Sequence, residues 1–472
     1  MTHKAKQESP SSVYNLLIIT IGACILWLTP PPVGVEQIGW QSFIIFLVTL
    51  ALIISKSYDM GVVSFIALSL SLVTGTLTID VCLEKFSYPV SWLVLMAFFI
   101  ARGFVVSGLG SRIALYMAAC LGSTPLRLSY ALIFAEVFIA PFIPSNTARG
   151  GGLIYPIAHS LGDNIFGKPV GIHKNQRHLT AFLLYGCFQA NLISSSMFLT
   201  AMAGNPMIAS IGATFGLDGD WVSWCKAAFL PGIICLLITP PLVMYLSDTN
   251  ITHVEDVKSK SHAAYVSLGS ISRKELIMAL TFLFLLGAWV IGPYFSIHPT
   301  SAAIIAVTGL LVTEVLTWQD VTSDSHAWTT FIWLTVLFTL SSAMKDYGFI
   351  SWFAHSIGYY MPQANPLLLL VILMAINFYA HYFFASLTSH ITTLFQPLMM
   401  VGLHAGIQMQ PLLFALAFST SLSAGLTHYG TGTGTVIYGS GYWTLRQWWK
   451  IGFFHSTIML IIFMIFGLPF WL

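Results

Sequence analysis

Charged residues are scarce in this sequence. Asp, Glu, Lys and Arg make up only 8% of its 472 residues, whereas soluble domains carry about 25%. Hydrophobic residues make up 56%, and the mean hydropathy is +0.81. No soluble core could bury this much apolar surface, so the composition excludes a water-soluble protein. It predicts a multi-pass integral membrane protein whose solvent is the lipid bilayer.

Other absences exclude further classes of protein. The net charge is only +2 and no run of basic residues occurs, so we expect no nucleic-acid partner. The six cysteines form no CxxC motif, and we interpret them as buried small apolar residues rather than disulfides or metal ligands. No Ser/His/Asp, paired-carboxylate or metal-ligand set is present, so we expect neither an enzyme nor any cofactor beyond a sodium ion.

The distribution of basic residues predicts how the chain is organised. Of 19 Lys and Arg residues, 16 precede residue 275, and short cytoplasmic loops of membrane proteins are enriched in these residues. We therefore expect a cytoplasmic N-terminus (1–13), a first membrane half (14–247), a cytoplasmic linker (248–275) and a second membrane half (276–472). Apolar runs recur throughout, and following them from loop to loop gives an all-α fold of about eleven transmembrane helices plus two re-entrant hairpins.

Two polar tripeptides identify the hairpins. Ser-Asn-Thr at 145–147 recurs as Ser-Leu-Thr at 386–388, 241 residues downstream, and each lies between apolar arms, at 126–161 and 367–403. A polar tip surrounded by lipid is costly unless it lines a water-filled cavity. We therefore expect each segment to enter and leave the membrane on one face, and the two hairpins to enter from opposite faces.

Weaker matches with similar spacing indicate an internal repeat. The pair Leu-Thr at 77–78 recurs at 316–317, 239 residues on, and the stretch that begins at Gly108 resembles the one that begins at Gly348. Because the crossing count places the two halves in opposite orientations, the repeat is expected to be inverted. Carriers with inverted repeats bind their substrate near the membrane midplane.

The tips carry side chains suited to binding an anion. Ser, Asn and Thr can cap the outgoing helix, and the start of a helix offers free N–H groups and partial positive charge. Arg149 and His390 each follow the tip serine by four residues, and Arg149 is the best candidate for a direct substrate or charge-compensating role. Glu136 is available to pair with a basic residue in a structural ion pair. The alternative for the tip side chains is that they bond only to their own helix.

Two more segments are expected to interrupt helices. One contains Gly-Asn-Pro at 204–206, which is a strong helix breaker, and the other alternates glycine and threonine at 427–435. Broken helices expose carbonyls that can bind cations and N–H groups that can bind anions. His381, His390 and His428 cluster in the motifs of the second half, and the alternative for each is a hydrogen-bonded histidine in a packed bundle.

Four motifs together resemble the divalent-anion/sodium symporter family, and they read PSNTARGGGLIYPIA, LTAMAGN, FFASLTSH and GLTHYGTGTGTVIYGSGY. The chain looks most like plastidic 2-oxoglutarate/malate translocators and bacterial citrate/succinate antiporters. The resemblance implies an elevator-type carrier for small dicarboxylate anions, usually a homodimer, with a scaffold and a moving transport domain. The substrate-facing residues that it implies are Ser145, Asn146, Thr147, Ser386, Thr388, Thr427 and His428. A sodium ion, where one is used, would be held at Ser145, Asn146, Ala201 and Gly204.

One departure from the family pattern affects the expected mechanism. Sodium-coupled members have an asparagine in the second tip as well, and this chain has Leu387 there. Our hypothesis is that the positive charges of Arg149 and His390 substitute for bound sodium in offsetting a dianion. We therefore expect exchange of dicarboxylates such as 2-oxoglutarate and malate, across a bacterial-type inner membrane or a plastid inner envelope. The alternatives are a sodium-coupled dicarboxylate symporter and an anion channel or oxyanion permease.

Overall fold

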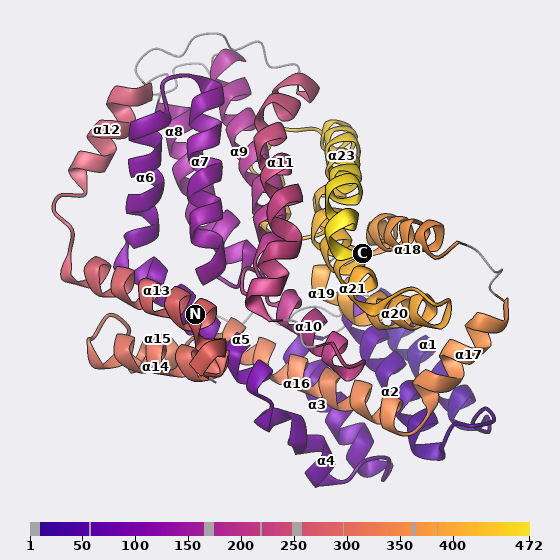
Figure 1. The fold of residues 1–472 in the computed structure, drawn as a ribbon. Coiled ribbons are helices and arrows are strands. Elements are labelled where there is room, and N and C mark those ends of the chain that lie inside the picture. The colour runs from indigo at the N-terminus through magenta and orange to yellow at the C-terminus, as the bar shows by residue number, and fades with distance from the viewer. Residues whose placement is uncertain are drawn as a thin grey trace.

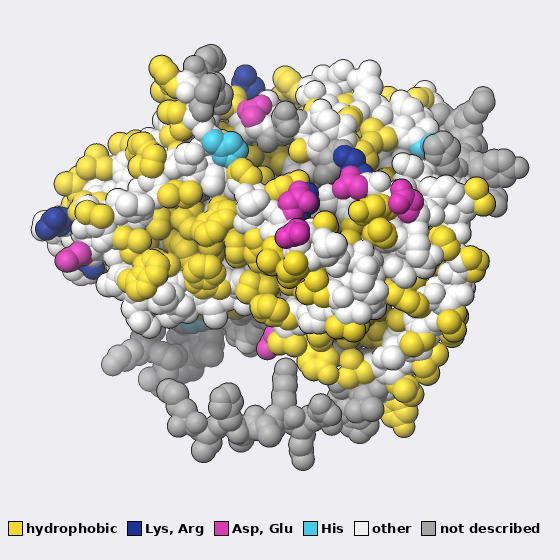
Figure 2. Space-filling model, turned by 90° about the horizontal axis from the view of Figure 1, so that it is seen from below, with side chains coloured by type: hydrophobic (Ala, Val, Ile, Leu, Met, Phe, Trp, Pro, Cys, Tyr) yellow, Lys and Arg dark blue, Asp and Glu magenta, His cyan; other side chains and the backbone are white. Residues whose placement is uncertain are grey.

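The computed structural model describes residues 10–55, 58–164, 174–217, 220–247, 257–295, 297–360, 365–384 and 386–472. Within these ranges every regular element is a helix (Figure 1). Among the described residues, eight helices are long and apolar enough to cross a membrane, and five shorter apolar helices accompany them. Broad areas of the surface are apolar and carry few charges (Figure 2), as a protein embedded in lipid requires. The all-α membrane fold predicted from composition is confirmed at this level.

The helices of the first half are α1 (Pro10–Trp27), α2 (Gln37–Ile54), α3 (Met60–Val73), α4 (Ile79–Glu84), α5 (Pro89–Ser107), α6 (Leu109–Leu121), α7 (Pro125–Ile139), α8 (Tyr155–Asn164), α9 (Lys174–Met197), α10 (Gly204–Thr214) and α11 (Trp221–Leu246), with the short helices η1 (Lys85–Ser87), η2 (Ala140–Phe142) and η3 (Thr147–Ile154).

Those of the predicted linker and the second half are α12 (Val257–Ser267), α13 (Arg273–Ile291), α14 (Pro299–Val312), α15 (Trp318–Thr322), α16 (Ser325–Asp346), α17 (Phe349–Tyr360), α18 (Pro366–Ala380), α19 (Leu387–His390), α20 (Gln396–His404), α21 (Met409–Ser423), α22 (Gly432–Gly439) and α23 (Leu445–Trp471), with η4 (Gly292–Phe295), η5 (His381–Phe383), η6 (Ile391–Phe395) and η7 (Ala424–Leu426).

The helices pack in two groups. We call α7–α11 together with α18–α23 the hairpin group, in which α9 lies against α7, α8, α11 and α21 (Figure 1). We call α2–α5 together with α13–α16 the frame group, in which α16 lies against α2, α3 and α5. A cavity of about 690 Å³ lies where the two groups meet, bordered by Thr200 and Trp221 on one side and by Leu93 and Pro299 on the other.

The internal repeat is visible in the backbone. Gly108 and Gly348, 240 residues apart, both adopt a left-handed conformation with φ of 80° and 82°. Gly75 has φ of 68°, and Glu314, 239 residues later, has φ of 60°. Glu314 is the one non-glycine residue with positive φ among the described residues. It occupies the position after the end of α14 where helices usually place glycine, so the repeat preserves the turn even where the favourable residue is absent.

An exposed polar contact connects the halves. Arg102 of α5 donates to the carboxylate of Asp320 at the start of α15, with Nη2 3.2 Å from Oδ1. Hydrogen bonds from the hydroxyl and backbone N–H of Thr317 hold the pKa of Asp320 below its usual range, and Arg102 adds to this effect. Asp320 also completes a capping box with Thr317, so this carboxylate fixes both α15 and its position against α5.

The predicted linker is partly helical. Residues 248–256 and the N-terminal residues 1–9 lie outside the described residues, but α12 occupies 257–267 and packs along α6. Arg112 of α6 donates to Glu275, with Nε 2.6 Å from Oε1, and to the carbonyl of Gly269. The turn between α12 and α13 is therefore fixed to α6.

The interpretation of the cysteines needs a correction. Cys82, Cys187 and Cys235 are buried as expected, whereas Cys24 and Cys120 are exposed and Cys225 is half-buried. The exposed surface of a membrane protein faces lipid, so a cysteine on that surface is in an apolar environment just as one in a core is.

The strained turn after α14 gives a test of the repeat. We expect Glu314→Gly to stabilise the protein by about 0.5 kcal/mol, because relief of the left-handed strain exceeds the added flexibility of the unfolded chain. Gly75→Ala should destabilise it by about 1 kcal/mol, since it creates the same strain in the first half. Thermal unfolding of the purified protein measures both changes, and a fall in unfolding temperature for Glu314→Gly would contradict this account.

Candidate functional site

The first tip lies at the turn of a helical hairpin. Helix α7 passes through η2 into residues 143–146, and the chain returns through η3 and α8. The hydroxyl oxygen of Ser145 accepts from the backbone N–H of Ala148 at 3.1 Å, and the carbonyl of Ser145 accepts from the N–H of Arg149 at 2.9 Å. The serine therefore caps the outgoing helix, while its hydroxyl hydrogen is not needed for the cap.

The second tip repeats this arrangement. Helix α18 passes through η5, and the chain returns through α19, η6 and α20. The hydroxyl oxygen of Ser386 accepts from the N–H of Ser389 at 3.2 Å, and the carbonyl of Ser386 accepts from the N–H of His390 at 3.1 Å. The tripeptides found in the sequence thus have one local structure, in which the hydroxyl oxygen of each serine caps the returning helix.

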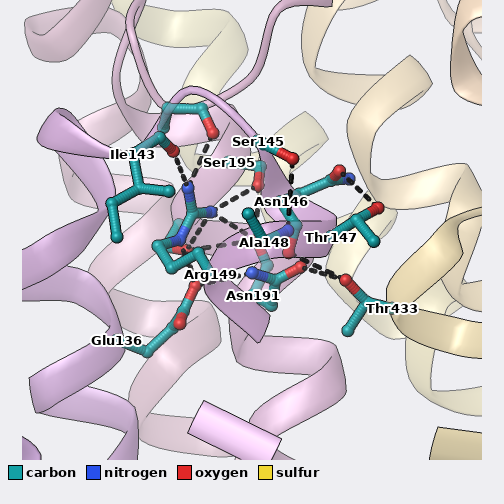
Figure 3. Close-up of polar contacts among 12 residues, drawn as sticks. Glu136, Ile143, Ser145, Asn146, Thr147, Ala148, Arg149, Asn191, Ser195 and Thr433 are labelled. Carbon is teal, nitrogen blue, oxygen red and sulfur yellow. Dashed lines mark hydrogen bonds and ion pairs between the residues drawn. The ribbon is translucent and has the colours of Figure 1, made fainter. Parts of the chain in front are cut away.

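Arg149 lies beneath the first tip in a fully buried polar cluster (Figure 3). Its Nε donates to Glu136 Oε1 at 2.5 Å, and Nη1 donates to the carbonyls of Ile143 at 2.6 Å and Ala201 at 2.7 Å. Nη2 donates to the hydroxyl of Ser195 at 2.7 Å and to the carbonyl of Asn191 at 3.3 Å. Every N–H group of the guanidinium is therefore engaged by the protein.

In this geometry the Arg149 side chain contacts only protein groups, and its predicted contact with substrate stays a prediction. Its side chain is 0% exposed and points toward Glu136 and Ile143, whereas Thr147 and Thr433 lie on the other side of the tip (Figure 3). Glu136 neutralises the guanidinium, so Arg149 supplies no net charge to a bound dianion. The carbonyl of Ala201, one of the positions predicted to hold sodium, accepts a hydrogen bond from Arg149.

The second hairpin contains a corresponding cluster without charge. Asn377 follows Glu136 by 241 residues, the same spacing as the tips. Its Oδ1 lies 3.0 Å from His390 Nε2, and Nδ1 of His390 lies 2.9 Å from Nδ1 of His381. His390 is fully buried and stacks on Phe384. Its predicted direct contact with substrate stays a prediction.

The two predicted helix interruptions are confirmed. Residues 198–203 separate α9 from α10, and residues 427–431 separate η7 from α22. The hydroxyl of Thr200 donates to the carbonyl of Pro141 at 2.5 Å, which joins the first interruption to the first hairpin. Gly204, at the start of α10, packs against Ile391 of the second hairpin.

The second interruption contacts both hairpins. Thr433 donates to the carbonyl of Asn146 at 2.8 Å, and a side-chain carbon on Gly432 would lie 2.6 Å from the hydroxyl of Thr147. A side-chain carbon on Gly430 would lie 2.5 Å from His381 Nε2 of the second hairpin. The segment 427–433, which we call the bridging segment, therefore brings together residues predicted from separate motifs.

The predicted contact residues differ in exposure. Asn146, Thr147, Ser386, Thr388 and His428 are half-buried, so each presents part of its side chain at a surface. Ser145 is 7% exposed.

Thr427 is fully buried, and its hydroxyl has no hydrogen-bond partner among the described residues. Hydroxyl and amide donors predominate here, and the site contains no unpaired Lys or Arg among the described residues.

Three polar residues of this region were not among the predicted contact residues. Asn191 donates to Glu136 at 2.7 Å, Asn377 holds His390, and Thr433 fixes the first tip. A signal for Asn377 was available, because Glu136 and Asn377 have the same spacing as the tips. No sequence motif surrounds Asn191, so its contact with Glu136 is apparent only once the helices have packed.

Comparisons with known proteins agree with this architecture. The sodium:sulfate symporter transmembrane region matches residues 10–472. Dicarboxylate transporter 1, chloroplastic, of Spinacia oleracea is 38% identical over 98% of this chain and 81% of its own length. The citrate/succinate antiporter of Escherichia coli K12 is 30% identical over 97% of this chain and 98% of its own length.

Among solved structures, MtrF of Neisseria gonorrhoeae, described as one of a class of antimetabolite efflux pumps, has a TM-score of 0.57. It is 11% identical to this chain, and the match covers 98% of this chain and 95% of MtrF. At this identity the likeness concerns the fold alone. The match of the family description across nearly the whole chain decides the identity: this chain belongs to the sodium:sulfate symporter family of membrane transporters.

Proposed function

We propose that this protein is a secondary carrier that exchanges C4 and C5 dicarboxylates, such as malate and 2-oxoglutarate, across a bacterial inner membrane or a plastid inner envelope. The names of the relatives from spinach and Escherichia coli support this substrate class. One structural observation carries the proposal. Two hairpins with the same capped tip lie against one bridging segment, so a small ligand can be held from both halves at once.

The proposed architecture has about eleven transmembrane helices and two re-entrant hairpins that enter from opposite faces, with the N-terminus in the cytoplasm. The corresponding order of elements in the two halves supports an inverted repeat. In an elevator mechanism the hairpin group would move against the frame group, and the cavity between them supports this division. We expect a homodimer, as the family resemblance implies.

The ligand would be held by neutral donors. Hydroxyls of Ser145, Thr147, Ser386 and Thr388 and the amide of Asn146 lie at the tips, and Thr427 and His428 lie on the bridging segment. Hydrogen bonds to an ionised carboxylate are worth about 1.5–3 kcal/mol each. Several such bonds suffice for binding without a buried positive charge, which is consistent with the neutralised Arg149.

Arg149 offers a reason for transport without sodium. Its guanidinium donates to carbonyls of the first tip and of the interruption 198–203, and such carbonyls are the groups that hold sodium in broken helices. Arg149 therefore acts as a positioning residue that replaces a cation structurally. Sodium-coupled symport is the second candidate, because the family description names sodium and Ser145 and Asn146 remain at the tip. An anion channel or oxyanion permease is the third.

Counterflow distinguishes these functions. In liposomes preloaded with malate, 2-oxoglutarate or nothing, we expect uptake of labelled 2-oxoglutarate only when a counter-substrate is inside. Replacing sodium with choline should not change the rate. Strict dependence on sodium with uptake into empty liposomes would favour symport, and uptake that does not saturate would favour a channel.

Substitutions at the tips test the site. We expect Asn146→Ala and Thr388→Ala each to reduce exchange about tenfold or more, because each removes a hydrogen bond to a carboxylate. Thr308→Ala, at an exposed position on α14 of the frame group, is the matched control and should leave the rate unchanged. Unimpaired exchange by both tip variants would place the substrate elsewhere.

The ion pair beneath the first tip predicts a non-additive effect on stability. Arg149→Gln leaves Glu136 as an unpaired buried charge and should destabilise the protein by about 3–5 kcal/mol. The double variant Glu136→Gln with Arg149→Gln should recover part of this loss, because no charge remains unpaired. Thermal unfolding of both variants measures these changes in stability. An equal loss of stability in the two would show that the pairing of charges is not what stabilises the hairpin.

A further inference from the structure

The hydrogens of the buried cluster in the second hairpin can be assigned from geometry. The amide nitrogen of Asn377 donates to the carbonyl of Leu416 at 3.0 Å and to the hydroxyls of Ser419 and Thr420 at 2.8 Å. A carbonyl only accepts, so the other amide atom, which faces His390 Nε2, is the oxygen. His390 Nε2 must therefore carry a hydrogen and donate it to Asn377.

This assignment leaves one basic nitrogen in the pair of histidines. With its hydrogen on Nε2, neutral His390 has a bare Nδ1, which accepts from Nδ1–H of His381 at 2.9 Å. His381 then has its lone pair on Nε2. That atom is buried and has no hydrogen-bond partner among the described residues.

A second buried group without a partner faces the same point. A side-chain carbon on Gly430 would lie 2.5 Å from His381 Nε2 and 3.0 Å from the hydroxyl oxygen of Thr427. The Thr427 hydroxyl also has no partner among the described residues. Buried polar groups are normally satisfied, so two such atoms beside one glycine indicate that a hydrogen bond forms here in another state of the protein.

The surroundings contain little fixed charge. The titratable neighbours are Tyr379 on α18, Tyr382 on η5, and His428 and Tyr429 on the bridging segment, with Tyr429 donating to the carbonyl of Tyr382. Helix α23 contributes Trp449 against Tyr382, and the adjacent Lys450 is exposed. None of the ion pairs among the described residues includes His381 or His390.

We propose that His381 and His390 form a proton-binding site in which a proton taken from water binds at Nε2 of His381 when the dicarboxylate binds. This inference rests on the proposed function and adds a coupling ion to it. The new N–H bond makes His381 a donor to the Thr427 oxygen, and a charge-assisted hydrogen bond of this kind is stronger than a neutral one.

The hydroxyl of Thr427 provides the link to the substrate. The Thr427 hydroxyl has a single hydrogen. When His381 is neutral, Thr427 can bond to the bare Nε2 of His381 only by donating this hydrogen. When His381 is protonated, Thr427 accepts from it and its own hydrogen becomes available to a carboxylate. Proton binding therefore strengthens binding of the dianion, and the dianion strengthens binding of the proton, as linkage requires.

The test measures proton uptake during binding. Calorimetric titration of the purified protein with malate, in buffers that differ in ionisation heat, gives the number of protons taken up per malate. We expect about one proton over the pH range in which the pair titrates, and a dissociation constant that rises by up to about tenfold per pH unit above it. His381→Gln should abolish the uptake and flatten the pH dependence. His326→Gln, exposed on α16, should behave as the wild type does.

A second variant tests the hydrogen-bond assignment. Asn377→Asp gives His390 a charged partner, as Glu136 does for Arg149, so His390 keeps hydrogens on both nitrogens. His390 then donates to Nδ1 of His381, and the hydrogen of His381 moves to Nε2, facing Thr427. We expect tight malate binding that no longer depends on pH. This readout also holds if His381→Gln fails to fold.

The outcomes separate the two levels of the proposal. Absence of malate binding by the wild type at every pH, together with absence of counterflow, overturns the proposed function. Malate binding with equal proton uptake in the wild type and His381→Gln overturns the proton site alone. A pH dependence that persists in Asn377→Asp overturns the assignment of hydrogens on which the site depends.

Discussion

The buried ion pair of Arg149 and Glu136 is the interaction on which the first hairpin depends. Bringing an arginine to membrane depth costs about 2.5–3.5 kcal/mol on insertion scales, and only a complete set of partners offsets this. Arg149 bonds to Glu136 on α7, to Ile143 at the tip, to Ser195 on α9 and to Ala201 in the interruption. One side chain thus satisfies the carbonyls that two breaks in helical structure leave free, and lipid offers no alternative donor.

The second half meets the same requirement with neutral groups. Asn377 stands where Glu136 does and His390 where Arg149 does, yet no ion pair results. Because Asn377 carries no charge, the second cluster is held by neutral hydrogen bonds, whereas the first is held by an ion pair. The two hairpins therefore contain one ion-paired and one uncharged version of a single arrangement, and the latter contacts the bridging segment through His381.

Packing explains the alternation of glycine and threonine in the bridging segment. Gly430 and Gly432 lie so close to His381 and Thr147 that any side chain would collide with them. The side chains of the threonines between and after these glycines bond to backbone groups. The Thr431 hydroxyl caps α22, and the Thr433 hydroxyl donates to the carbonyl of Asn146. The segment contacts two hairpins at once because its glycines allow close approach on both sides.

Composition and local pattern determined the membrane class, the helix interruptions and the two tips, because apolar content, capping residues and breakers act within a few residues. The spacing of 241 residues also revealed the repeat. The directions of Arg149 and His390 were decided by tertiary structure. Both have positions in the sequence that suggest a ligand contact, but each points into its own half, where a partner from a neighbouring helix satisfies it. A buried polar side chain takes the direction of its best partners, and a partner such as Asn191, which no motif marks, is known only after the helices have packed.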